Sequence, residues 1–209
     1  MRVVRVLVLL AIAWIAPAQS PLSPAARAAM TGVSWKPGCP VPLDDLVAVK
    51  VKYLGFDGSR HEGTVVVNKR FADDIVHIFA DLYGIHFAIH KISPWENYGE
   101  DKYAEQDITT GYYCEKADDA PDQWSSHAYG IAVDINPLEN PFRDKHKPWW
   151  PKGSAQFAIR DRGRGKVTSE SGVVGIFAKY GWAWGGVEKD ETDYMHFNKK
   201  TNRRELEVK

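Results

Sequence analysis

The chain has 209 residues, of which 44% are hydrophobic and 12% aromatic, which is enough for one packed domain and short for two. Its 27 basic and 27 acidic residues balance to a formal charge of zero, with a pI near 7.1. This balance excludes the basic surface that nucleic-acid binding usually requires, so no nucleic-acid partner is expected.

Residues 1–18 predict a signal peptide for export. Two arginines form a basic start, residues 6–16 form an apolar run, and Ala16-Pro17-Ala18 is a small-x-small cleavage site. A second cleavage site is available after Ala28. The apolar run is shorter than the roughly twenty residues that span a bilayer, so no stable membrane span is expected after cleavage. The protein is therefore expected to be periplasmic or secreted.

Residues 19–38 are rich in Ala, Pro, Ser and Gly without periodicity, which predicts a flexible lead-in before a folded domain over 39–209. The chain has two cysteines, Cys39 and Cys114. An exported chain meets an oxidising compartment, so a disulfide between them is predicted. Two buried free thiols are the alternative, and cysteines this far apart do not resemble a zinc ribbon.

The first elements of the domain follow from apolar periodicity. Alternating apolar and polar residues predict a strand over 47–53, and a short strand is expected over 64–67. Asn68 is a candidate N-cap for a helix that ends at Gly84. The apolar stripe of this helix has helical spacing and consists of Phe71, Ile75, Ile78, Phe79 and Leu82.

The later elements mix strands and helices without regular alternation. A strand is expected over 85–92 and a second helix over 171–180, whereas the segments 93–122 and 141–166 have little pattern and are expected to be irregular. This order favours an α+β fold: a single domain with a small antiparallel sheet and flanking helices.

The irregular segment 93–122 and the residues just after it contain many aromatic side chains: Trp95, Tyr98, Tyr103, Tyr112, Tyr113 and Trp124. One interpretation is that they form the wall of a groove for a glycan or a peptide. The other is that they pack in the core beside the disulfide. The sequence leaves both interpretations open.

The residues that indicate chemistry lie in two segments. His127 and Asp134 are seven positions apart, so a straight strand would point them to opposite faces, and Gly130 supplies the place where the chain can bend. Asp193 and His196 follow in a DxxH spacing. Two imidazoles and one carboxylate are a common ligand set for a catalytic zinc ion, with one position left for water.

These two segments also carry a family resemblance. Residues 125–134 fit the pattern SxHxxGxAxD, and a WGG followed by DYxHF at residues 193–197 fits a second signature. Together they resemble the D-Ala-D-Ala carboxypeptidase and VanY-like zinc peptidases, the M15 family, which includes L-alanyl-D-glutamate endopeptidases. The likeness extends from Trp35 to Phe197.

The resemblance implies a hedgehog/DD-peptidase-like fold, a Zn²⁺ ion held by His127, Asp134 and His196, and Asp193 as the catalytic general base. Four residues are weaker candidates for substrate contact: Ser125, Tyr194, Thr110 and Lys116. The chain departs from the family at Glu115, where many members have an arginine that contacts substrate. It departs again at Val187-Glu188, where Asp-Trp is common.

The expected function is that of an exported zinc metallopeptidase that cuts peptidoglycan stem peptides, as a D,D-carboxypeptidase or as an L,D-endopeptidase. The alternative is a non-catalytic, zinc-containing module that binds the cell wall. Asp193 favours the enzyme, because a binding module needs no carboxylate three residues before a metal ligand. A calcium-binding domain is disfavoured because calcium prefers oxygen to imidazole. The bond that is cut and the oligomeric state stay open.

Overall fold

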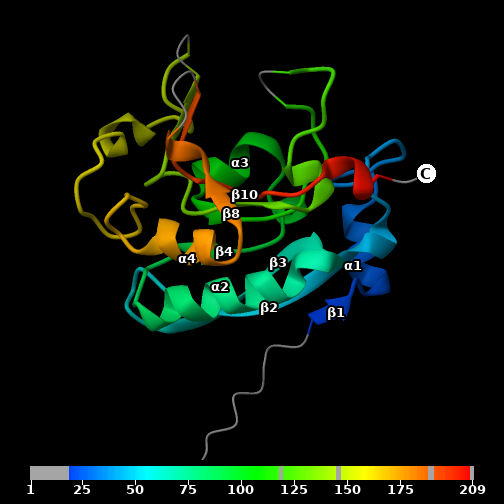
Figure 1. Cartoon of the computed structure of the whole chain (residues 1–209), viewed down its shortest axis with the longest axis horizontal. Helices are drawn as coiled ribbons and strands as arrows, with labels where there is room; N and C mark the ends of the chain where they lie inside the picture. The colour runs from blue at the N-terminus through cyan, green and yellow to red at the C-terminus, as the bar shows by residue number, and fades with distance from the viewer. Residues whose placement is uncertain (1–18, 118–119, 145–146, 188–190, 208–209) are drawn as a thin grey trace, which may run out of the picture.

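A computed structural model describes residues 19–117, 120–144, 147–187 and 191–207 (Figure 1). The predicted signal peptide, residues 1–18, lies outside the described residues. The strands are β1 (Gln19–Pro21), β2 (Leu46–Leu54), β3 (Arg60–Asn68), β4 (Lys91–Ile92), β5 (Ile108–Thr109), β6 (Ala132–Asp134), β7 (Phe142–Asp144), β8 (Trp182–Trp184), β9 (Glu191–Asp193) and β10 (His196–Lys199). The α-helices are α1 (Pro24–Met30), α2 (Ala72–Gly84), α3 (Glu100–Glu105) and α4 (Val173–Lys179). The predicted α+β class is confirmed.

Short 3₁₀ turns connect these elements. They are η1 (Leu43–Asp45), η2 (Lys69–Phe71), η3 (Trp95–Asn97), η4 (His127–Tyr129), η5 (Ser154–Phe157), η6 (Gly185–Val187) and η7 (Arg203–Glu205). None of the helices in the described part of the chain has the length and apolar character needed to cross a bilayer.

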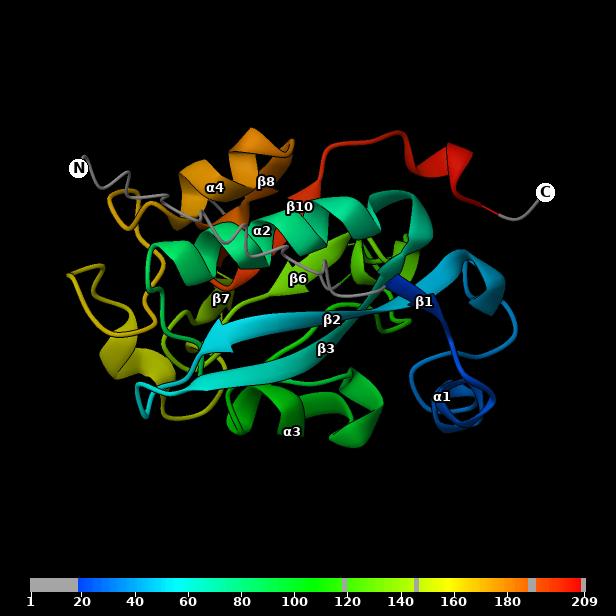
Figure 2. The same cartoon turned by 90° about the horizontal axis from the view of Figure 1, so that it is seen from below.

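The longest strands form the β2–β3 hairpin, and β1 adds a third strand at the edge beside β2. The predicted alternation is confirmed, since Val49, Val51 and Tyr53 are buried while Lys50 is exposed. Figure 2 shows α2 along one side of this hairpin and α3 on the opposite side.

Helix α2 confirms the predicted apolar stripe. Ile75, Ile78, Phe79 and Leu82 are each at most 1% exposed, whereas Phe71 is half-buried and lies just before the helix. The Asn68 side chain accepts a hydrogen bond from the backbone N–H of Arg70, 3.1 Å away. It therefore caps the 3₁₀ turn η2 that leads into α2, rather than α2 itself.

A second antiparallel sheet, in the order β6-β10-β8, carries the later motifs. Its Val133 and Phe197 belong to the same buried cluster as α2 and the hairpin, and the predicted second helix, α4, contributes Val173 and Phe177 to that cluster. The two sheets are thus joined by one continuous core, which fixes the β6–β10 pair relative to the rest of the domain.

The predicted flexible lead-in over 19–38 is wrong. Gln19 pairs with Val49 in the first sheet, and α1 begins after Ser23, whose hydroxyl accepts a hydrogen bond from an N–H of the first helical turn. Leu22 is 4% and Met30 0% exposed. Two isolated apolar anchors in an Ala- and Pro-rich segment have no periodicity, so composition alone could not reveal that the segment is part of the fold.

The predicted disulfide is confirmed. Cys39 and Cys114 lie 75 residues apart in sequence, with Cα atoms 6.0 Å apart and a bonded sulfur pair. The backbone N–H of Cys114 also donates to the carbonyl oxygen of Ser34, at 2.9 Å. The segment after α1 is therefore held against the segment that precedes His127.

The region 85–122 is more compact than predicted. Of the strand expected over 85–92, only β4 forms, and it pairs in parallel with β5. Phe87 and Ile89 are buried in the main core, so their alternation comes from packing rather than from a strand ladder. Four of the six aromatic residues are buried as well: Trp95, Tyr103, Tyr112 and Tyr113. Core packing alone is confirmed for Tyr112, whereas the other three are buried and also line the cavity described below, and Tyr98 and Trp124 are half-buried.

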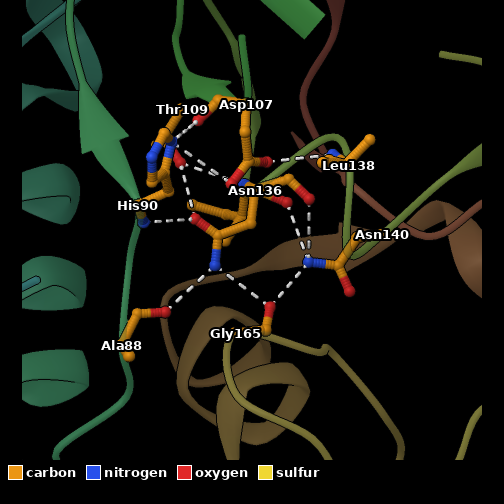
Figure 3. Close-up of polar contacts among 9 residues, drawn as sticks. Ala88, His90, Asp107, Thr109, Asn136, Leu138, Asn140 and Gly165 are labelled. Carbon is orange, nitrogen blue, oxygen red and sulfur yellow. Dashed lines mark hydrogen bonds and ion pairs between the residues drawn. The ribbon is translucent and has the colours of Figure 1, made fainter. Parts of the chain in front are cut away.

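The loop after β6 is held by the side-chain amide of Asn136 (Figure 3). Its Nδ2 donates to the carbonyl oxygens of Ala88 and Gly165, each at 3.0 Å, and its Oδ1 accepts from the backbone N–H of His90, at 3.0 Å. Asn140 adds a hydrogen bond of 2.8 Å from its Nδ2 to Gly165. Because three separate segments are tied here, the end of β6 that carries Asp134 has little freedom to move.

Two acidic side chains, Asp107 and Glu139, form a buried pair beside this network. Burial, followed by the charge of Asp107, raises the pKa of Glu139 to about 9, so Glu139 keeps its proton at neutral pH and donates it to Asp107 in a hydrogen bond. A buried proton shared by two carboxyl groups is a structural contact that an ionised Glu139 would break.

Glu139→Gln is expected to weaken the fall in the free energy of unfolding that accompanies rising pH. The folded pKa lies above the unfolded one, so the folded state holds an extra proton between about pH 5 and about pH 9, and the free energy of unfolding falls as the pH rises through this range. Urea unfolding at several pH values should show this slope in the wild type and in the control Glu105→Gln, an exposed position. The slope should be shallower in Glu139→Gln, most clearly between about pH 7 and about pH 9, above the raised pKa of Asp193; an unchanged slope there would mean that Glu139 holds no extra proton in the folded state.

Candidate metal centre and active-site cavity

Elements from two distant parts of the chain meet at one point. His127 lies on η4, Asp134 ends β6 and His196 begins β10, where it pairs opposite Asp134. Between the first two, Gly130 has a φ of +68°, and a Cβ at this position would lie 2.6 Å from the backbone nitrogen of Asn68. The bend predicted at this glycine is confirmed, and it turns both side chains toward His196.

Three donor atoms come together here. His127 Nε2 lies 3.1 Å from His196 Nδ1, and Asp134 Oδ1 lies 3.2 Å from the former and 3.1 Å from the latter. Zinc bonds of about 2.0–2.1 Å at tetrahedral angles place ligand atoms about 3.3 Å apart. The three separations therefore fit a shared metal ion, and the sequence prediction that these residues converge is confirmed.

Each imidazole is oriented by a second hydrogen bond. His127 Nδ1 lies 2.6 Å from the carbonyl oxygen of Gly111, so this nitrogen carries the proton and Nε2 presents its lone pair to the centre. His196 Nε2 lies 3.0 Å from the hydroxyl of Ser126, which leaves Nδ1 toward the centre. Such outer contacts fix the ring orientation and raise the basicity of a metal-binding histidine.

The carboxylate of Asp134 is held by two tyrosines that the sequence analysis did not place at the site. Its Oδ2 accepts hydrogen bonds from the hydroxyls of Tyr103, at 3.1 Å, and Tyr113, at 3.3 Å. Burial raises the pKa of both phenols well above the ordinary value, so they remain donors. The aromatic cluster was noticed in the sequence, but only the fold shows that these two phenols contact Asp134.

The charge state of Asp134 is set by its neighbours. Burial acts to raise the pKa of this carboxyl group, but in the metal-free site the imidazoles of His127 and His196, when they are protonated, outweigh burial and hold the pKa well below its usual range. Asp134 is therefore ionised, which is the state that a cation requires of a carboxylate ligand.

Asp193 lies at the end of β9, opposite Phe142 of β7. Its Oδ1 is buried and has no hydrogen-bond partner among the described residues. Burial, with added repulsion from Asp134, raises the pKa of Asp193 to about 7, although His196 acts in the opposite direction. A carboxyl group poised near neutral pH is suited to accept and release a proton.

The first glycine of the WGG motif leaves room for this group. A Cβ at Gly185 would lie 3.1 Å from the Cβ of Asp193 and 3.5 Å from the Cβ of His196. The first distance is shorter than ordinary van der Waals contact and the second is ordinary contact, so a side chain here would press on Asp193. Glycine at position 185 therefore allows β9 and the start of β10 to approach η6 closely.

The four residues His127, Asp134, Asp193 and His196 line a cavity of about 1100 Å³. Its aromatic walls are formed by Trp95, Tyr103, Tyr113, Phe142, Trp149 and Trp150. Its further charged residues are Glu115, Lys116, Lys147, Lys152, Glu191 and Arg203. A cavity of this size is larger than a single dipeptide requires, so it can take an extended ligand.

Two of the four residues predicted to contact substrate line the cavity. Ser125 does, although its hydroxyl accepts a hydrogen bond from the backbone N–H of His127, at 3.2 Å, and Lys116 does as well. Thr110 is fully buried and pairs with Asp134 through backbone hydrogen bonds of 3.1 and 2.9 Å. Tyr194 packs against the ring of Trp149 and borders a separate, smaller pocket. The structure therefore does not bring Thr110 or Tyr194 to the cavity.

Comparison with known proteins identifies one family. Residues 119–199 match the family model of a peptidase family described as D-alanyl-D-alanine carboxypeptidase. No curated protein and no solved structure matches the chain. The matched segment contains His127, Asp134, Asp193 and His196. The match confirms the resemblance seen in the sequence, over the segment that supplies all four of these residues.

Proposed function

We propose that this protein is an exported zinc-dependent peptidase that hydrolyses peptide bonds in peptidoglycan stem peptides. One observation carries the proposal: three donor atoms of two histidines and an aspartate at metal-ligand spacing, beside a buried carboxyl oxygen that has no partner among the described residues. The family match to a peptidase supports the reaction type.

The donor set favours zinc. His127, His196 and Asp134 supply two nitrogens and one oxygen, which suits zinc and leaves a coordination position for a reactant, whereas calcium would prefer oxygen donors. The chemistry that zinc supplies at such a site is Lewis acidity, which lowers the pKa of water toward about 7 and polarises a carbonyl group.

Asp193 performs the proton transfer in this proposal. As a carboxylate it accepts the proton of the attacking water at Oδ1, and it then donates this proton to the amine that leaves. Burial keeps the acid and base forms of Asp193 close in energy near neutral pH, because it penalises the charged form. The same residue can therefore serve both steps.

The substrate class follows from the family description and from the cavity. A D,D-carboxypeptidase would release the terminal D-alanine, and an L,D-endopeptidase would cut between L-alanine and D-glutamate. The alternative function is a non-catalytic, zinc-containing module that binds the cell wall. Asp193 supports the enzyme, since neither holding zinc nor binding the wall requires a buried carboxyl oxygen that lacks a hydrogen-bond partner among the described residues.

Export is proposed from the signal peptide that the sequence predicts over residues 1–18. Cleavage after Ala18 would leave Gln19, the first residue of β1, at the new N-terminus. Cleavage after Ala28 would instead remove β1, most of α1 and the buried Leu22. The first site is therefore the one that preserves the folded domain, and a periplasmic or secreted location is proposed.

Mass spectrometry of digested muropeptides tests the proposed function. We expect the purified protein to release either a terminal D-alanine or the fragments of L-Ala-D-Glu cleavage, to lose this activity with a chelator and to regain it with zinc. The mass of the product identifies the bond. A protein that binds zinc and muropeptides but leaves their masses unchanged would instead be the binding module.

A further inference from the structure

One end of the cavity carries two cations, Lys116 and Arg203, that both contact Trp124. The ammonium of Lys116 lies 3.8 Å above the ring of Trp124, and Arg203 Nη1 donates a hydrogen bond to the carbonyl oxygen of Trp124, at 3.3 Å. The guanidinium of Arg203 also lies 5.7 Å from the ring centre of Tyr129. Both cations line the cavity. Their positions are therefore set by aromatic contacts and a backbone carbonyl.

This end of the cavity adjoins the metal centre. Ser126, whose hydroxyl contacts His196, is two residues after Trp124, a separation of at most about 7 Å along the backbone. Asn198 lies two residues after His196 on β10, and alternate residues of a strand share a face. Asn198 and Ser126 both line the cavity, so a polar wall connects Arg203 with the metal ligands.

The two cations at this end have no ion-pair partner among the described residues. Among the residues that the structure describes, the salt bridges involve neither Lys116 nor Arg203. The acidic residues Glu115 and Glu191 also line the cavity, and each has an interaction of its own. A guanidinium that is half-buried and held in place is the preferred partner for a planar carboxylate, because its two N–H groups match the two oxygens.

We infer that Arg203, assisted by Lys116, binds a free carboxylate of the substrate and thereby selects it. This inference rests on the proposed peptidase function and adds the residue that recognises the substrate. The separation of at most about 7 Å between Trp124 and Ser126 corresponds to about two residues of extended peptide. With the side chains at both ends added, the recognised carboxylate lies within a few residues of the bond that is cut. The C-terminal carboxylate and the α-carboxylate of D-glutamate both meet this requirement.

Stem pentapeptides with one carboxylate blocked test the inference. The three probes are the unmodified peptide, its C-terminal amide, and the peptide with an amide at the D-glutamate α-carboxylate. In the wild type, blocking the recognised carboxylate should raise KM by about 10- to 100-fold, which corresponds to one charged hydrogen-bonding pair. The amide that has this effect identifies which of the two carboxylates is bound.

Arg203→Gln should lose the discrimination between the unmodified peptide and that amide, mainly through KM, and Arg203→Lys should retain part of it. Lys116→Gln should show a smaller loss. Arg204→Gln is the matched control, because Arg204 is the exposed neighbour that does not line the cavity. An acid-to-amide ratio in Arg203→Gln equal to that of the wild type would overturn the inference.

Calorimetric binding of the same three peptides to chelator-treated protein separates this inference from the proposed function. If the wild type cuts none of them, the peptidase proposal fails. The carboxylate site then still predicts weaker binding of one amide in the wild type and no such difference in Arg203→Gln. Equal affinities for all three peptides in the wild type would overturn the site itself.

Discussion

Asp193→Asn is expected to lower kcat by about 10²- to 10⁴-fold, the usual contribution of a general acid–base group. The substitution keeps the size of the side chain but removes its ability to accept a proton. Asp193 is not one of the three donors that share the centre, so zinc stoichiometry should stay at the wild-type value. Steady-state hydrolysis of a stem peptide, with zinc measured on the same sample, checks both parts.

The pH profile provides the control for this role. A base acts only as the carboxylate, so kcat/KM of the wild type should fall as the pH drops below the pKa of Asp193, which is raised to about 7. A bound cation lowers that pKa, so the acidic limb should lie at or below about pH 7. The residual activity of Asp193→Asn should lack this limb. Unchanged turnover in the variant would assign the proton transfer to another group.

The fold was predictable where one face of an element packs on the core. The period-two pattern of β2 and the helical stripe of α2 are both visible in the sequence because each element is buried on one side only. Gly84 ends α2 as predicted. These elements account for much of the main core, and their local preferences agree with their tertiary contacts.

The fold was not predictable where few residues anchor a segment. In the segment 19–38, Leu22 and Met30 provide the buried contacts, and a composition rich in Ala and Pro conceals them. In the segment 85–92, Phe87 and Ile89 alternate because they enter the core from an irregular chain, so a strand was wrongly expected. Local sequence cannot distinguish these cases, because the partner surfaces come from elsewhere in the chain.

The convergence of the three donor residues was predictable and their supporting contacts were not. His127, Asp134 and His196 follow from motif spacing, and Gly130 gives the physical reason why the first two can converge. The hydrogen bonds from Tyr103 and Tyr113 to Asp134 depend on how α3 and the segment before η4 pack, which no spacing encodes. Arg203 lies beyond both motifs, and only the fold brings it to the cavity.

His127→Ala is expected to abolish both zinc binding and hydrolysis. Losing an outer hydrogen-bond partner already weakens metal binding by about 10- to 100-fold, so the loss of one of three ligands should cost more than about 100-fold. His77→Ala is the matched control, because this exposed histidine lies on α2 and stacks on Tyr180. His77→Ala should retain zinc and activity.

Zinc is also expected to stabilise the folded chain of the same variants. A metal that binds only the folded chain stabilises it by RT ln(1 + [L]/Kd), about 4 kcal/mol when zinc is present at about 1,000 times Kd. The melting temperatures of the wild type and of His77→Ala should therefore fall with a chelator and recover with zinc, whereas His127→Ala should melt at one temperature in both conditions.

His127 is 3% exposed and stacks on Tyr113, so its removal also lowers the melting temperature without metal. The response to zinc, rather than the melting temperature itself, is the decisive quantity, and a full response in His127→Ala would show that the ion binds elsewhere.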